Sequence, residues 1–305
     1  MTEKDFIQKL ADTLKNVPAT VAVPSLRQYS PALAQGRADR FSRLMAKTDA
    51  RFVSRKDMLV QPHRTLYRLA QNARMEVHHA SGDLRFVAGL NPMESLFAKV
   101  ETREVLTRNV EAAASKLDIR QWIGKNEELP FERLWQIKAA SVDQKGQASD
   151  PVLCRAIGAY RHHIAKIPVL GAASAVVKLA GNGELDAFSV SVRETSDQLL
   201  GTERVLRADA GAKQLYAQLA SLMGKSKSAP FEMATPQWVR FGYLAQSRRQ
   251  AQRVLVPVFM AAIDIKTENE QQGYIVTVPA TSNPSLLPSL RGADIPADLE
   301  RRIRK

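Results

Sequence analysis

The chain has 305 residues, of which 45% are hydrophobic and 25% are charged. These fractions are typical of soluble globular proteins and exclude fibrous and intrinsically disordered chains. The length suits one large domain or two ordinary ones, and we predict two. The formal net charge of +13 favours acidic partners, such as nucleic acid, anionic lipid or an acidic protein surface.

The single cysteine, Cys154, excludes an intramolecular disulfide and any zinc site built on paired cysteines. Glu3, Lys4 and Asp5 stand where a signal peptide would carry an apolar run of about 7 to 15 residues. The longest apolar run, residues 254–263, is about half as long as a membrane span of about 20 residues. We therefore expect a cytoplasmic protein with no transmembrane segment.

Residues 1–50 are predicted to form a basic N-terminal helical arm. Apolar side chains recur at helical spacing over residues 3–15. A link over residues 17–25 follows. Ser30 and Pro31 then provide the N-cap and first position of a second helix.

Residues 51–150 are predicted to form a first sheet-and-helix unit. Extended segments with a turn at residues 80–83 precede a helix over residues 101–118, whose apolar residues form one stripe. Residues 129–143 resemble a strand, and a polar loop ends the unit.

Residues 151–280 are predicted to form a second such unit, and residues 281–305 a C-terminal tail. The turn at 181–183, Gly-Asn-Gly, lies between two alternating segments and predicts a hairpin. Further strands are expected on both sides of a helix over residues 209–223. This order favours an α+β fold of two related sheet-and-helix units with antiparallel hairpins.

Two pairs of adjacent histidines, His78–His79 and His162–His163, are the first candidates for a metal or catalytic site. Neighbouring residues on a strand point to opposite faces, so neither pair can chelate one ion from a regular strand. A site would require the two pairs to meet in the fold. The plainer expectation is one histidine turned inward with a hydrogen bond, and its neighbour solvated.

Other catalytic signatures are missing from the sequence. It contains no HExxH, GxSxG, Walker A or GxGxxG pattern. Cys154 is expected to be a buried structural thiol rather than a nucleophile. We therefore predict a protein that is not an enzyme, with no cofactor and no metal.

Basic residues concentrate between residues 27 and 74, where eleven Lys or Arg stand against three acidic residues. Several recur at intervals of three and four, a spacing that places side chains on one helix face. Such a face can bind phosphates or an acidic protein, or it can be an ordinary solvated face. The predicted partner-binding residues are Arg37, Arg40, Arg43, Lys47, Arg51 and Arg55.

The segment GAYRHHIAKIPVLGAASAVVKLAGNGELDAFSVSVRE, residues 158–194, resembles the core hairpin of PepSY and FTP-like domains. These domains occur in metallopeptidase propeptides and in larger extracytoplasmic proteins. The resemblance extends over residues 60–280. It implies a sheet-and-helix surface that binds another polypeptide, and no catalytic residues carry over from it.

The sequence thus predicts a non-catalytic protein-binding or assembly protein that uses an exposed sheet surface and a basic helical arm. Its partner is expected to be an acidic protein or a second copy of itself. Two alternatives stay open. One is nucleic-acid binding through the Arg-rich arm, and the other is a metal-dependent or hydrolytic enzyme that uses the histidine pairs.

Overall fold

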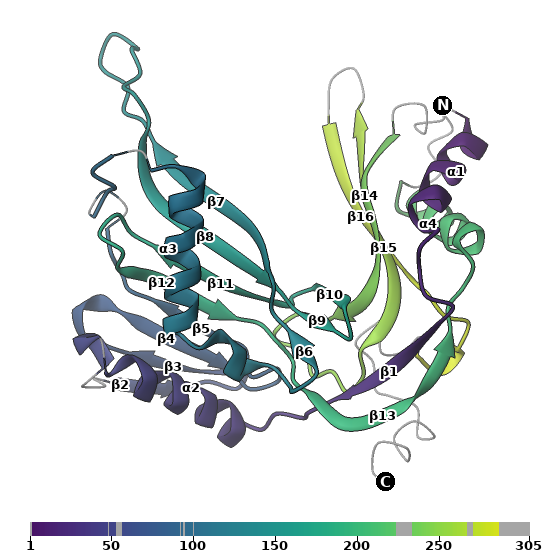
Figure 1. Ribbon diagram of the computed structural model, residues 1–305, viewed down its shortest axis with the longest axis horizontal. Helices are drawn as coiled ribbons and strands as arrows, with labels where there is room; N and C mark the ends of the chain where they lie inside the picture. Colours follow the sequence, from purple (N-terminus) through teal and green to yellow (C-terminus); the bar gives the residue numbers. More distant parts are fainter. Residues whose placement is uncertain are drawn as a thin grey trace.

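The computed structural model describes residues 2–47, 49–52, 57–91, 93, 95–99, 101–223, 234–266 and 271–286. This part of the chain forms four α-helices and three mostly antiparallel sheets, which confirms the predicted α+β class. Each of the two larger sheets carries two helices on one face (Figure 1). The third sheet is a two-stranded pair.

The first large sheet has eight strands, and every neighbouring pair in it is antiparallel. From one edge to the other the strands are β2 (Asp57–Val60), β3 (Arg64–Arg68), β4 (Arg74–His78), β5 (Leu84–Val87), β12 (Leu185–Val190), β11 (Ser174–Leu179), β8 (Val152–Arg161) and β7 (Phe131–Ala139). The turns expected at residues 80–83 and 181–183 join β4 to β5 and β11 to β12.

Helices α2 (Pro31–Met45) and α3 (Arg103–Lys116) cover one face of this sheet (Figure 1). The Ser30 side chain caps α2 by accepting a hydrogen bond from the backbone N–H of Leu33, as the sequence predicts. Phe41 of α2 stacks on Phe188 with the ring centroids 5.2 Å apart. A Cβ at Gly158 would lie only 2.1 Å from a Val110 methyl carbon, so α3 approaches β8 closely because residue 158 is glycine.

Gly36 lies in the middle of α2 and is exposed, with no atom within 4 Å of the position that a Cβ would take. We expect Gly36→Ala to raise the free energy of unfolding by about 0.5 to 1 kcal/mol, because alanine restricts the unfolded chain and favours the helix. Urea denaturation measures this change. Gly158→Ala is the opposite control and should destabilise the protein, and a destabilised Gly36→Ala variant would contradict the expectation.

The second large sheet has six strands, and it contains one parallel pair, β10 with β14. Its strand order is β16 (Gln271–Pro279), β15 (Val256–Lys266), β14 (Ala234–Ala245), β10 (Ile167–Gly171), β9 (His163–Ile164) and β6 (Glu127–Glu128). Helices α1 (Glu3–Thr13) and α4 (Ala208–Met223) pack on one face of it. Phe6 and Leu215 from these helices are buried with Phe259 of β15 in one core.

The first 50 residues are distributed over both units instead of forming a separate arm. α1 packs against α4 of the second unit, whereas α2 covers the first sheet. Between them, the segment expected as a link forms β1 (Thr20–Leu26), which pairs with β13 (Thr195–Arg204). Val21 and Val23 of β1 are buried, so the alternation of small apolar residues outweighs the prolines in this segment.

The sheets also do not divide the chain at residue 150. β8, β11 and β12 follow that boundary in sequence but belong to the eight-stranded sheet, with β12 paired to β5. The predicted second unit therefore contributes strands to both sheets. Of the expected tail, residues 281–286 are described and Leu286 is buried, and residues 287–305 lie outside the described residues.

Candidate partner-binding surface

Among the described elements, no helix covers the second face of the eight-stranded sheet. On β3 and β4, Tyr67, Met75 and Val77 are buried in the core beneath the two helices. Side chains alternate along a strand, so the residues between them point to the opposite face. We call this surface the helix-free face.

The helix-free face is rich in positive charge. Its acidic side chains at regular strand positions are Asp57 and Glu76, and two further carboxylates, Glu132 and Asp186, lie at strand bulges. Its basic side chains are Arg64, Arg68, Arg74, Arg85, Arg133, Arg155, Arg161 and Lys178.

Part of this charge is neutralised within the face. Asp186 forms ion pairs with Arg155 at 2.9 Å and with Lys178 at 2.8 Å. Glu76 pairs with Arg64 at 2.8 Å. These carboxylates offset only the basic side chains that lie beside them.

Three exposed arginines on adjacent strands, Arg68, Arg74 and Arg85, form what we call the basic row. Arg68 lies 3.9 Å from Asp57, but both side chains are strongly exposed and such pairs contribute little. Arg74 and Arg85 form no ion pair with any described residue, although Arg85 stands directly opposite Glu76 of β4. Arg68 also stands directly opposite Arg74, and like charges in that position destabilise an antiparallel pair. An anion over these strands would relieve the repulsion.

The opposite end of the helix-free face is apolar. Trp135 and Ile137 of β7 are 45% and 42% exposed, and Val152 of β8 is 40% exposed. The Arg133 guanidinium lies 5.6 Å from the centroid of the Trp135 ring, within the range of a cation–π contact. We call these four residues the Trp135 patch. Exposed Trp and Arg are the residue types that contribute most at protein interfaces.

The six-stranded sheet carries a second pair of this kind, in which the Arg240 guanidinium lies 5.6 Å from the Trp238 ring centroid. Arg240 also pairs with Glu132 of β7 at 3.2 Å, and Glu132 pairs with Arg161 at 2.9 Å. Burial alone would raise the pKa of Glu132, but the hydrogen bonds and charges of these two arginines lower it. Figure 1 shows the helices on the outer sides of both sheets, so the two helix-free faces turn toward each other and are bridged at Glu132.

Two of the six predicted partner-binding residues are buried instead of exposed. Arg37 is 5% exposed and lies on the core stripe of α2, three residues after Ala34 and four before Phe41. Arg51 is also 5% exposed and pairs with Asp49 at 2.6 Å and with Glu184 at 3.1 Å. Neither side chain is available to a partner in this structure.

Arg40 and Arg43 are exposed on α2, and Lys47 is exposed in the turn that follows it. They lie on the helical side of the eight-stranded sheet, away from the basic row. Arg55 lies outside the described residues. The predicted single basic helix face is thus reduced to three exposed residues.

Both histidines of the first pair are buried. His79 Nε2 lies 2.9 Å from the Thr65 hydroxyl, whereas neither ring nitrogen of His78 has a hydrogen-bond partner among the described residues. Burial lowers the pKa of His78, although Glu76 opposes this shift from 4.0 Å. The expectation of one solvated neighbour fails at this pair, because the turn after β4 buries His79 as well.

The second pair lies at a break between strands. β8 ends at Arg161, and a two-residue turn at Ala165 and Lys166, both with positive φ, joins β9 to β10. His162 is completely buried, while His163 is half-buried with Nδ1 3.1 Å from a backbone carbonyl oxygen. This arrangement matches the expectation of one inward histidine.

Glu127 of β6 holds His162 in place. The distance from Glu127 Oε2 to His162 Nε2 is 2.7 Å, and the backbone N–H of Gly124 donates to the same oxygen at 3.0 Å. The Thr195 hydroxyl and backbone N–H donate to the other carboxylate oxygen. Burial alone would raise the pKa of Glu127, but these hydrogen bonds and the His162 charge hold it at about 2. The cluster joins β6, the β8–β9 break and the start of β13, so it serves as a structural clamp.

Within the described residues, no group of three or more His, Cys, Asp or Glu side chains could hold a metal ion. None of the described helices is long and apolar enough to cross a membrane.

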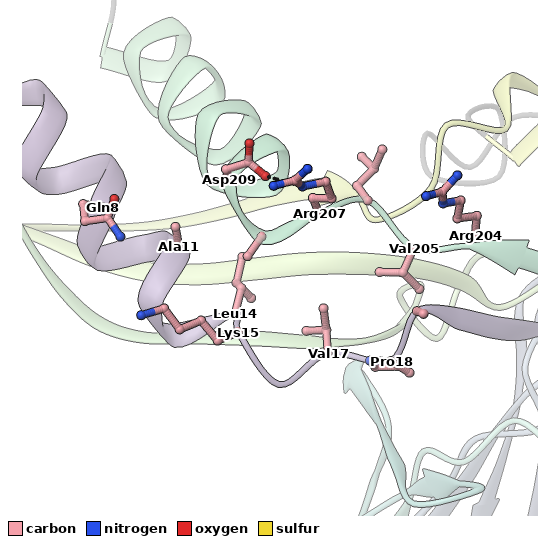
Figure 2. Close-up of a pocket in the computed structure, with 13 residues that line it drawn as sticks. Gln8, Ala11, Leu14, Lys15, Val17, Pro18, Arg204, Val205, Arg207 and Asp209 are labelled. Carbon is pink, nitrogen blue, oxygen red and sulfur yellow. Dashed lines mark ion pairs between the residues drawn. The ribbon is translucent and has the colours of Figure 1, made fainter.

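Two cavities lie away from the helix-free face. A cavity of about 540 Å³ separates the end of α1 from the start of α4; Leu14 and Val17 line it, with Lys15 and the Arg207–Asp209 ion pair at its border (Figure 2). A groove of about 1070 Å³ lies between the ends of α2 and α3 and the β11–β12 turn. Lys47 and Arg51 of the predicted set line this groove, and Arg51 is already paired there.

No family model matches the sequence, and no curated protein matches it. A solved structure of an uncharacterized protein from Eubacterium rectale is similar over 88% of this chain and 86% of that one, with a TM-score of 0.56 and 8% identity. This likeness shows a shared fold only. The Bacillus megaterium YpeB C-terminal domain is a weaker match, with a TM-score of 0.33 and 12% identity over 84% of this chain and 95% of that one. A TM-score this low does not show a shared fold.

The basic row and the Trp135 patch were not predicted, although both have a signal in the sequence. β3 and β4 alternate charged and apolar residues, RTLYR and RMEVH, which is the pattern of strands with one face outside the core. β7 places a tryptophan and an isoleucine at spacing two among polar residues. What the pattern could not show was that these strands share one sheet.

Proposed function

We propose that this protein is a non-catalytic binding protein that docks an acidic protein partner on the helix-free face of its eight-stranded sheet. The observation that carries this proposal is the basic row, in which Arg68 opposes Arg74 and neither Arg74 nor Arg85 has an ion pair with a described residue. The Arg68–Arg74 pair is unfavourable within the sheet, whereas a negatively charged partner would gain a complementary surface.

The Trp135 patch supports a protein partner. It gives the same face an apolar end with a Trp and an Arg in contact, which is the composition of interface hot spots. A partner that spans both ends would combine electrostatic steering at the basic row with apolar burial at the patch.

The test compares two triple charge reversals on opposite sides of the sheet. The first combines Arg68→Glu, Arg74→Glu and Arg85→Glu, and the matched control combines Arg40→Glu, Arg43→Glu and Lys47→Glu. We expect the first to weaken binding of labelled polyglutamate by about tenfold or more at low salt, and less at high salt, because the contacts are screened. The control changes net charge equally and should retain most of the affinity.

Equal losses of polyglutamate affinity in the two variants would mean that only net charge matters and would contradict a site on the sheet. A loss of affinity in the α2 variant alone would place the site on the basic helix that the sequence predicts. Thermal unfolding of both variants checks that they are folded.

Nucleic acid is a second candidate partner, because Trp135 and Trp238 each lie beside an arginine and could stack on bases. The same variants should be titrated with single-stranded and duplex oligonucleotides over a range of salt concentrations. Tighter binding of an oligonucleotide than of polyglutamate, with a salt dependence reduced by loss of the basic row, would favour this candidate over the first.

A further inference from the structure

A buried histidine stands where the two large sheets meet. His78 ends β4 and is 2% exposed, and neither of its ring nitrogens has a hydrogen-bond partner among the described residues. Its backbone N–H donates to the carbonyl oxygen of Asp83 across the hairpin at 2.8 Å, so the two side chains lie on the same face of the sheet. Asp83 is buried as well, and its Oδ2 has no hydrogen-bond partner among the same residues.

A loop of the six-stranded sheet packs over this end of the eight-stranded sheet. We call residues 246–250, which follow β14, the junction loop. The Ser81 hydroxyl donates to the carbonyl oxygen of Arg248 at 2.9 Å, and the Arg193 guanidinium donates to two further carbonyl oxygens of the loop at 3.0 and 2.7 Å. The junction loop contains no apolar residue, and segments with few buried apolar contacts open at a low cost in free energy.

Arginines outnumber carboxylates around His78. The carboxylates that face the ring are those of Asp83 and Glu76. Glu76 Oε1 lies 4.0 Å from His78 Nε2 and 3.9 Å from Arg248 Nη1. Four arginines among the described residues lie beside these two carboxylates: Arg64 of β3, Arg85 of β5, Arg193 after β12 and Arg248 of the junction loop. A proton on His78 would add a further positive charge to this cluster.

We propose that protonation of His78 releases the junction loop from the eight-stranded sheet, so that the contact between the two large sheets loosens in mildly acidic solution. Release moves Arg248 away from the ring and admits water to it. Both the repulsion between the two cations and the cost of burying the new charge are then relieved. A neutral ring meets neither cost, so the loop stays docked.

The direction of the pH dependence follows from the surroundings of the ring. Burial lowers the pKa of His78 from its ordinary value of 6.5; Glu76 and Asp83 oppose this shift, and Arg248 and Arg64 add to it. In the released state the ring contacts water and titrates near the ordinary value. Because the docked state has the lower pKa, docking is fully favoured above pH 6.5 and weakens as the pH falls from 6.5 through the docked-state pKa.

This proposal goes beyond the binding of an acidic partner and does not rest on it. The affinity for polyglutamate at neutral pH reports on the basic row, whereas the accessibility of residues beneath the junction loop reports on His78. Either proposal can therefore fail while the other holds.

Thiol labelling of the full chain provides the first test. Ser81 is completely buried beneath the junction loop, so the thiol of a Ser81→Cys variant reports on release of the loop. Its reaction with dithiodipyridine is followed by mass spectrometry at about pH 7.5 and about pH 5.5, relative to a free cysteine peptide at each pH. We expect this relative rate to rise about threefold or more at the lower pH. The native Cys154 is buried and reports on unfolding of the whole chain, so its relative rate should not rise.

His78→Phe in the same background keeps a buried ring that cannot take up a proton, and its relative rate should be the same at both pH values. His163→Phe is the matched control, because His163 is a half-buried histidine of β9, and this variant should keep the rise. A rise that persists in His78→Phe, or an equal rise at Cys154, overturns the proposal.

Arg248→Gln provides a second test that does not depend on the folding of His78→Phe. The Arg248 side chain is 45% exposed, so its replacement should leave the fold intact. It removes a positive charge that a protonated His78 meets, and the rise in relative rate should shrink to about half or less. An unchanged rise would contradict a release driven by repulsion at the junction loop.

Discussion

Glu127→Gln should lower the free energy of unfolding by about 3 kcal/mol at neutral pH. The Glu127 carboxylate is buried among His162, Thr195 and Gly124, and its pKa is held at about 2 against an ordinary value of 4.5. A neutral amide of the same shape has one acceptor oxygen, so it cannot accept the hydrogen bonds that both carboxylate oxygens accept here. Urea denaturation at pH 7 measures the loss.

The pH dependence of this loss has a definite direction. Because the folded-state pKa of Glu127 is depressed, its stabilising contribution is present above the ordinary pKa of 4.5 and disappears as the pH falls toward about 2. The difference in stability between wild type and Glu127→Gln should therefore shrink over that range. Glu128→Gln is the matched control, since Glu128 is the exposed neighbour. If Glu127→Gln were as stable as wild type at pH 7, the clamp would have no energetic role.

Arg37→Ala should destabilise the protein by about 2 to 4 kcal/mol, even though the sequence suggested that Arg37 binds a partner. Its guanidinium lies 5.4 Å from the Tyr29 ring centroid and 5.1 Å from that of Trp122. It also donates hydrogen bonds to the Tyr29 hydroxyl at 2.9 Å and to the carbonyl of Val192 at 3.2 Å. Truncation removes these contacts and leaves a cavity beneath α2.

Arg43→Ala is the control, because Arg43 is exposed on the same helix and its replacement should change stability by less than about 0.5 kcal/mol. Thermal and urea unfolding of both variants distinguish a structural arginine from a solvated one. Similar stabilities for the two variants would mean that the Arg37 contacts contribute nothing net.

The helices were predictable from the sequence because their signals are local. Ser30 and Pro31 mark the start of α2, and apolar spacing marks α1 and α3, so each range agrees with the structure to within a few residues. The hairpin turns at 80–83 and 181–183 were also predictable, since a turn needs only its own residues.

The partners of the strands could not be predicted in this way. β12 pairs with β5 across about a hundred residues, and nothing in either strand identifies the other. The break at His162 escaped prediction for a related reason. Ala165 and Lys166 adopt positive φ without a glycine or asparagine to signal the turn.

The same limit applies at the candidate site. Net charge indicated a basic surface, but helical spacing alone could not show that Arg37 belongs to the core stripe of α2. The basic row depends on three strands lying side by side, so it exists only in the folded sheet.

The packing of α1 on α4 has a consequence for folding on the ribosome. The eight-stranded sheet has all of its strands once β12 has been synthesised, whereas α1 must wait for α4 and β14 to β16. Until then the apolar face of α1, with Phe6 and Leu10, is not buried against the core that it joins in the folded protein. The six-stranded sheet with α1 and α4 thus depends on contacts between distant parts of the chain, and we expect it to fold later and more slowly than the eight-stranded sheet.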